Sequence, residues 1–199
     1  MIEQYDSVIF GIIKVVNNNR EVGMKKILLG IFASVFTVSG LLFSPVSAAP
    51  YCGITWGSLP KSAGTLSTPS LTNIRTGRHD CYDRMVVDLS GAASGYNVQY
   101  VDNVYADGSG KLIPLTGGAK LQIIVLNPAY DSSGQSTYPG VTGKALPGIN
   151  LTGYQTFRDA KFAGSFEGQT TIGLGVRARL PFRVLTIGNR VVIDVAHRW

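Results

Sequence analysis

The feature that most constrains the fold is a succession of short segments in which apolar and polar residues alternate. Residues 96–101 place Tyr96, Val98 and Tyr100 on one face, and residues 120–126 place Leu121, Ile123 and Val125 likewise. Alternation with a period of two residues is typical of strands with one buried face. No apolar period of 3.6 residues continues for ten residues, so the pattern predicts an all-β fold rather than a helical one.

Turn residues separate these segments and set their number. Gly188 and Asn189, for example, suit the tight turn of a closing hairpin. We therefore predict a β-sandwich of about eight or nine short strands. The segments that carry the pattern are residues 71–76, 84–89, 96–101, 111–115, 120–126, 155–166, 170–180, 182–187 and 190–195.

The chain before the strands has the pattern of an export signal. Met24 and two lysines precede the apolar residues 27–43, and a proline and small residues follow. We predict a signal peptide at 24–48 that is cleaved between Ala48 and Ala49. An uncleaved membrane anchor is the alternative, although this stretch of 17 residues falls short of the roughly 20 apolar residues that a span needs. Residues 1–23 are an upstream extension for which a mis-set start codon is the simplest explanation.

The exported part consists of an extended lead-in, residues 49–70, and the sandwich domain, residues 71–199. Its net charge limits the partners that it can bind. Four of the 18 basic residues and three of the 12 acidic ones precede residue 49, which leaves a net charge of about +5. Such a balance favours anionic surroundings such as wall polymers or lipid headgroups, and equally serves solubility. No basic run or basic helix is present, so we expect no nucleic-acid partner and membrane contact only during export.

Both cysteines, Cys52 and Cys81, belong to the exported part. An even number of cysteines in an exported chain indicates a disulfide, and two cysteines allow one intramolecular pairing. The alternative of a reactive or metal-binding pair lacks the close spacing that such sites have. We therefore expect a structural disulfide that ties the lead-in to the first strands.

One short pattern occurs twice. Residues 84–89 and 190–195 both read Arg, apolar, Val, apolar, Asp, apolar. Alternation places Arg84, Val86 and Asp88 on one face, and Arg190 and Asp194 occupy matching positions in the second copy. The repeat suggests a duplicated half-sandwich with Arg and Asp on equivalent outward faces, where exposed cross-strand ion pairs contribute about 0–1 kcal/mol.

Several stretches, in order, resemble the AMIN-like domain of exported bacterial envelope proteins. They are residues 76–89, 95–101, 107–110, 164–171, 180–184 and 194–199. The resemblance covers about residues 70–199 and implies a β-sandwich related to AMIN modules, which localise wall amidases and secretin subunits without catalysis. Unlike AMIN-containing enzymes, this chain has no catalytic domain after Trp199, so we expect the domain to act alone.

Residues for catalysis are few. His79 and His197 are the only side chains that titrate near neutral pH, no Gly-x-Ser-x-Gly motif is present, and the expected disulfide removes the thiol beside His79. Zinc needs three or four ligands at suitable spacing, which the sequence does not show. We therefore expect no enzyme activity, no cofactor and no metal, and a hydrolase is the least favoured alternative.

Residues for binding are easier to find. Arg177 and Arg179 alternate toward one side with Arg183 nearby, a pattern that suits the carboxylates or phosphates of a polymer. Phe166 and Glu167 lie in a glycine-flanked turn. We therefore predict a secreted, non-catalytic, envelope-associated domain that binds peptidoglycan or another anionic wall polymer through these residues. The alternative is a protein-interaction module that docks an envelope enzyme or an assembly partner.

Overall fold

The structure is a computed structural model that describes residues 51–199. The predicted signal peptide, its cleavage site and the upstream extension lie outside these residues. Within them the chain forms no helix that could span a bilayer. The elements are η1 (Tyr51–Gly53), β1 (Lys61–Gly64), β2 (Leu71–Arg78), β3 (Tyr82–Leu89), β4 (Gly95–Val101), β5 (Val104–Tyr105), β6 (Leu112–Ile113), β7 (Ala119–Val125), β8 (Phe157–Phe166), β9 (Gln169–Val176), β10 (Phe182–Ile187) and β11 (Arg190–Ala196).

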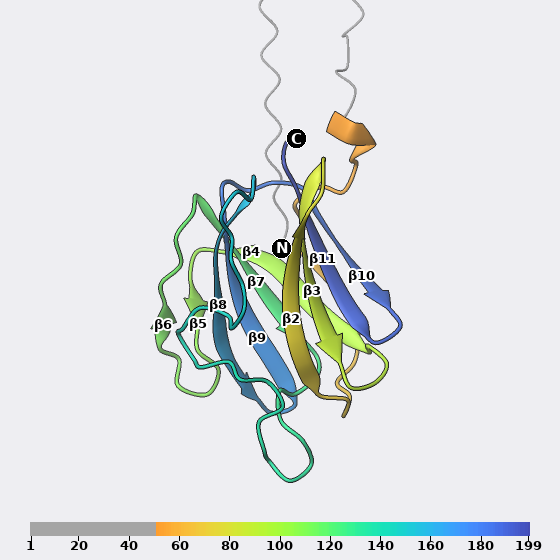
Figure 1. Cartoon of the computed structure of the whole chain (residues 1–199), viewed down its shortest axis with the longest axis vertical. Helices are drawn as coiled ribbons and strands as arrows, with labels where there is room; N and C mark the ends of the chain where they lie inside the picture. Colours follow the sequence, from red (N-terminus) through yellow and green to blue (C-terminus); the bar gives the residue numbers. More distant parts are fainter. Residues whose placement is uncertain (1–50) are drawn as a thin grey trace, which may run out of the picture. The chain divides into compact units, whose positions relative to one another are not determined.

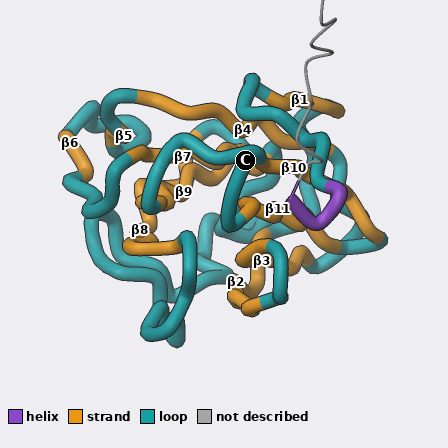
Figure 2. Tube along the Cα trace, turned by 90° about the horizontal axis from the view of Figure 1, so that it is seen from above, coloured by secondary structure: helices purple, strands orange, loops and turns teal. Residues whose placement is uncertain are grey.

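Two antiparallel sheets form the sandwich. The larger has the strand order β1-β4-β7-β9-β8, and the smaller has the order β10-β11-β3-β2. Figure 1 shows them as two layers, and Figure 2 shows both sheets nearly end-on, with the β5–β6 hairpin outside the larger sheet. The all-β sandwich predicted from the alternating segments is therefore confirmed.

The core lies between the sheets and follows the alternation. Met85, Val87 and Leu89 of β3 face inward and are buried, and Ile193 of β11 is fully buried beside them. From the larger sheet, the inward residues of β7 and β9 meet them, including Ile123. Because each strand contributes one apolar face, closing the two layers removes these side chains from water, which is the main stabilising term.

The nine predicted segments all contain strands, and two further strands are present. β1 has the sequence Lys-Ser-Ala-Gly and pairs with β4 through main-chain hydrogen bonds at the edge of the larger sheet. β5 has two residues and pairs only with β6. Neither carries an alternating apolar pattern, so side-chain periodicity could not reveal them. The segment predicted as 170–180 ends as a strand at Val176.

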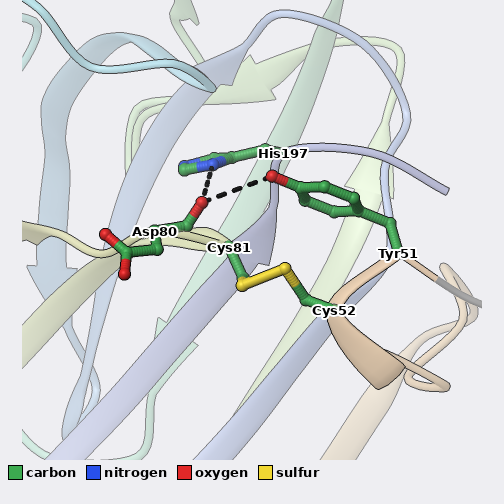
Figure 3. Close-up of a disulfide and its surroundings, with 5 residues drawn as sticks. All are labelled: Tyr51, Cys52, Asp80, Cys81 and His197. Atoms are coloured by element: carbon green, nitrogen blue, oxygen red, sulfur yellow. Dashed lines mark hydrogen bonds between the residues drawn. A yellow bond between two sulfur atoms is a disulfide. The ribbon is translucent and has the colours of Figure 1, made fainter.

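The expected disulfide joins Cys52 to Cys81 across a separation of 29 residues. Beside it, the Tyr51 hydroxyl donates to the Asp80 carbonyl at 3.4 Å, and the same carbonyl lies 3.2 Å from Nδ1 of His197 (Figure 3). The bond therefore fastens the lead-in segment to the turn between β2 and β3 and, through it, to the end of β11.

Candidate functional site

The two copies of the repeated pattern are neighbours in one sheet. β3 and β11 pair antiparallel, with Arg84 opposite Asp194, Val86 opposite Val192, and Asp88 opposite Arg190. This register gives the pair a local twofold axis between the two valines. The expected duplication of a half-sandwich is therefore wrong, because both copies lie in the smaller sheet. The expectation that Arg and Asp share the outward face is correct.

Asp194 lies at the centre of the first ion cluster. Arg84 donates to it from Nε at 2.6 Å and Nη2 at 2.9 Å, and Arg183 of β10 donates from Nε at 2.8 Å. The side chain of Asp194 is 0% exposed, because the two guanidiniums cover it. Hydrogen bonding to Asp194 raises the pKa of Arg84 above its usual value. This cluster is thus held more firmly than the exposed ion pair expected from the sequence.

Asp88 lies at the centre of the second cluster. Arg75 of β2 donates to both of its oxygens, from Nε at 2.9 Å and Nη2 at 3.1 Å. Nε of Arg190 approaches the same carboxylate at 3.4 Å. We call the outer surface of the smaller sheet that carries these two clusters the arginine face. Four guanidiniums surround two carboxylates there, so the arginine face has a net positive charge.

Aromatic rings border the first cluster. The Arg183 guanidinium lies 4.4 Å from the ring centroid of Trp56 and 5.5 Å from that of Tyr82. Tyr82 also stacks on His79 at 4.5 Å between centroids. Cation–π contacts of this kind restrict the rotamers of Arg183 and leave the edge of its guanidinium for a ligand.

A hollow of about 290 Å³ lies on the arginine face between the two clusters. Val86 and Val192, which are almost completely buried, are among its lining residues together with Arg75, Arg84 and Arg190. The arginine face thus combines charged groups with an apolar strip, an arrangement able to contact both the anions and the carbon skeleton of a ligand.

Arg177 and Arg179, predicted from the sequence to bind a ligand, lie elsewhere. Both are exposed and follow the end of β9, so strand alternation does not orient them. Arg177 donates to the carbonyl of His197, and Arg179 donates to Ser58 at 3.3 Å. The indole of Trp199, which is 66% exposed, donates to the Arg179 carbonyl. These two arginines therefore form a separate basic group near the C-terminal residues.

Phe166 and Glu167 lie at the β8–β9 turn, whereas Arg177 follows the opposite end of β9. Phe166 is 51% exposed and packs against the Gly108 backbone. Glu167 has a φ of 49°, a conformation that tight hairpin turns require. The five predicted binding residues thus occupy three separate places, and of them only Arg183 belongs to the arginine face.

The residues considered for catalysis have structural contacts. Asp83 is fully buried and accepts hydrogen bonds from the main-chain N–H groups of Thr156 at 2.6 Å and Phe157 at 3.1 Å. Nε2 of His197 lies 3.1 Å from its other oxygen. Asp194 contacts Arg84 and Arg183. Within residues 51–199, no three His, Cys, Asp or Glu side chains are placed to hold a metal ion together.

Sequence reasoning missed three residues of this region: Trp56, Arg75 and Tyr82. Arg75 lies on a predicted strand at an outward position, so the alternation could have indicated it. Trp56 reaches the sheet only because the disulfide and a hydrogen bond from the Phe182 N–H to the Gly57 carbonyl hold the lead-in there. Local pattern contains no information on such a contact.

The comparison with known families agrees with the resemblance seen in the sequence. The model of the AMIN-like domain matches residues 69–197, which includes all strands from β2 to β11. Neither the curated proteins nor the solved structures contain a significant match to the chain.

Proposed function

Because the chain belongs to the AMIN-like family, whose domains are generally non-catalytic, envelope-associated and related to peptidoglycan, we propose that it binds an anionic polymer of the cell wall through the arginine face. The disulfide is in keeping with a location outside the cytoplasm, where such bonds persist.

The observation that carries the proposal is the incomplete pairing of two arginines. Nη1 and Nη2 of Arg183 and of Arg190 donate to no acceptor in the described part of the chain. Arg75 and Arg84, by contrast, each bind their carboxylate with two nitrogens. Each cluster thus contains one arginine that neutralises the carboxylate and one that keeps two donors for a ligand. Guanidinium groups with free donors recognise carboxylates and phosphates with two parallel hydrogen bonds.

Both arginines with free donors are accessible to a ligand. The side chain of Arg183 is 35% exposed and that of Arg190 is 51% exposed. Asp194 also supplies a buried anchor that fixes the Nε of Arg183. Binding therefore requires little ordering of Arg183, which lowers the entropic cost of association.

Sedimentation with insoluble peptidoglycan tests the proposal. We expect the protein to be retained, with retention that weakens as salt increases because the contacts are ionic. The double variant R183Q/R190Q should lose about a hundredfold in affinity, since each of the two free guanidiniums contributes on the order of 1.4 kcal/mol through charged hydrogen bonds.

Two matched controls remove the same charge. K111Q/K144Q changes two exposed lysines on the β5–β6 hairpin and on the loop beside β8, and should leave retention unchanged. R177Q/R179Q tests the separate basic group predicted from the sequence. Loss in that variant alone would move the binding site to the end of β9. No retention of the wild-type protein, together with one stoichiometric partner recovered by cross-linking in cells, would replace wall binding by protein docking.

A further inference from the structure

The two arginines with free donors lie a defined distance apart. Arg183 is in β10, and Arg190 in β11 is the pairing partner of Ile187 in β10. Four residues along a strand span about 13 Å, at roughly 3.3 Å per residue. The Nε of Arg183 donates to Asp194 at 2.8 Å, and the Nε of Arg190 lies 3.4 Å from Asp88. The separation is therefore set by the sheet rather than by mobile loops.

The surface between the two arginines is apolar at its centre, and the neighbouring guanidiniums of Arg75 and Arg84 are already paired with carboxylates. Val86 and Val192 are exposed by only 5% and 3%, and Leu185 continues this row on β10 opposite Val192. The hollow of about 290 Å³ lies over the two valines. A third anion placed midway would meet the valines and two arginines that each already bind a carboxylate with two nitrogens, whereas carbon atoms would be accommodated by the valines.

We propose that the arginine face selects a polymer by the spacing of its anions: two oxyanions, carboxylate or phosphate, about 13 Å apart on one chain and joined by an uncharged segment. The inference rests on the proposed function and adds a ligand class to it. One anion binds the Nη donors of Arg183 beside Trp56, and the second binds those of Arg190 beside Ile187. Engaging both at once makes the second contact intramolecular, which raises affinity without any new contact.

Two peptides of the same composition, which differ only in the separation of their two carboxylates, test whether the protein prefers one spacing of anions. An extended peptide places residues i and i+4 on one side at about 13 Å. Acetylated and amidated Glu-Thr-Ser-Thr-Glu therefore presents two carboxylates at the required distance on one side. Glu-Glu-Thr-Ser-Thr has the same composition, but its two glutamates are adjacent and point to opposite sides of the extended chain. We expect the first peptide to bind about tenfold more tightly at low salt, measured by calorimetry on the full chain. Peptides with phosphoserine in place of both glutamates show whether phosphates are accepted with the same spacing preference.

Variants connect the preference to the two arginines. R183Q or R190Q alone should bring both peptides to the same weak affinity, because either change leaves one guanidinium with free donors. The control K111Q/K144Q should keep the tenfold preference. Equal binding of both peptides by the wild-type protein would overturn the spacing inference.

The outcome of this experiment is distinct from that of the proposed function. If peptidoglycan is retained through Arg183 and Arg190 but the peptides bind equally, polymer binding stands and selection by spacing does not. If peptidoglycan is not retained by the wild-type protein, the proposed function fails whatever the peptides do.

Discussion

Replacing Asp83 by alanine should destabilise the protein more than any other single loss of a carboxylate. Asp83 belongs to β3 in the smaller sheet, and its main-chain partners Thr156 and Phe157 lie at the start of β8 in the larger one. His197, which follows β11, donates to the same carboxylate. The side chain thus joins three segments and is 0% exposed.

The magnitude follows from what the alanine leaves behind. Two main-chain N–H groups and one imidazole N–H lose their acceptor in a region from which water is excluded. Each unsatisfied buried donor costs about 1–3 kcal/mol. We therefore expect D83A to lower the free energy of unfolding by about 4 kcal/mol, a large part of the roughly 5–15 kcal/mol typical of a domain.

Urea unfolding followed by the fluorescence of Trp56 and Trp199 measures this loss. With an m value of about 2 kcal/mol/M, the midpoint should fall by about 2 M at unchanged m. D83N keeps an oxygen for the two main-chain donors and should lose about half as much. D80A, at an exposed neighbouring carboxylate, is the control and should stay within about 0.5 kcal/mol of wild type. A loss below 1 kcal/mol for D83A would refute the reasoning.

Three further changes test other parts of the structure. C52S/C81S removes the disulfide that closes a loop of about 30 residues and should lower the free energy of unfolding by about 3.5 kcal/mol by the chain-entropy estimate. Reduction of the wild-type protein should cause an equal loss, and thermal unfolding with and without reductant measures both. Burial raises the pKa of Asp107 in the folded protein above its ordinary value of 3.8, so the contribution of Asp107 to the free energy of unfolding is most favourable at low pH and is lost as the pH rises through the folded pKa. D107N should abolish this part of the pH dependence of stability, and identical stability–pH profiles of D107N and the wild type would contradict the prediction. G175A places a Cβ 1.9 Å from the Thr116 carbonyl oxygen and should displace the chain that follows β6, with a loss of stability measurable by urea unfolding. G134A is the control: Gly134 lies in an open loop with a positive φ, so this change adds backbone strain without a steric clash.

Much of the architecture could be predicted from local pattern. The alternation in β4, β7 and β9 has a period that only strands match, and it identified their inward faces correctly, as with Leu121 and Ile123. The cysteine pair allowed one bridge only. The strands that escaped prediction, β1 and β5, are held by main-chain pairing and have almost no side-chain pattern.

The site was predicted less well, because its residues come together only through register. The repeated pattern showed that Arg84 and Asp88 share a face, but not that β11 would lie beside β3 in antiparallel register. That register exchanges the pairs, so that Asp194 binds Arg84 and Asp88 meets Arg190. Proximity in sequence was misleading for Arg177 and Arg183, which the turn after β9 separates into different surroundings.

The amino-acid sequence by itself thus determined the class of fold, the inward and outward faces of its strands and the disulfide, because each depends on residues that are adjacent or on a single possible pairing. Tertiary structure alone decided which charges meet. The arginine face depends on the order β10-β11-β3-β2, which brings Arg75, Asp88 and Arg190 together from three strands, and on the lead-in that delivers Trp56 to Arg183. Such contacts between distant segments are selected by the burial of the whole core, and no local pattern encodes them.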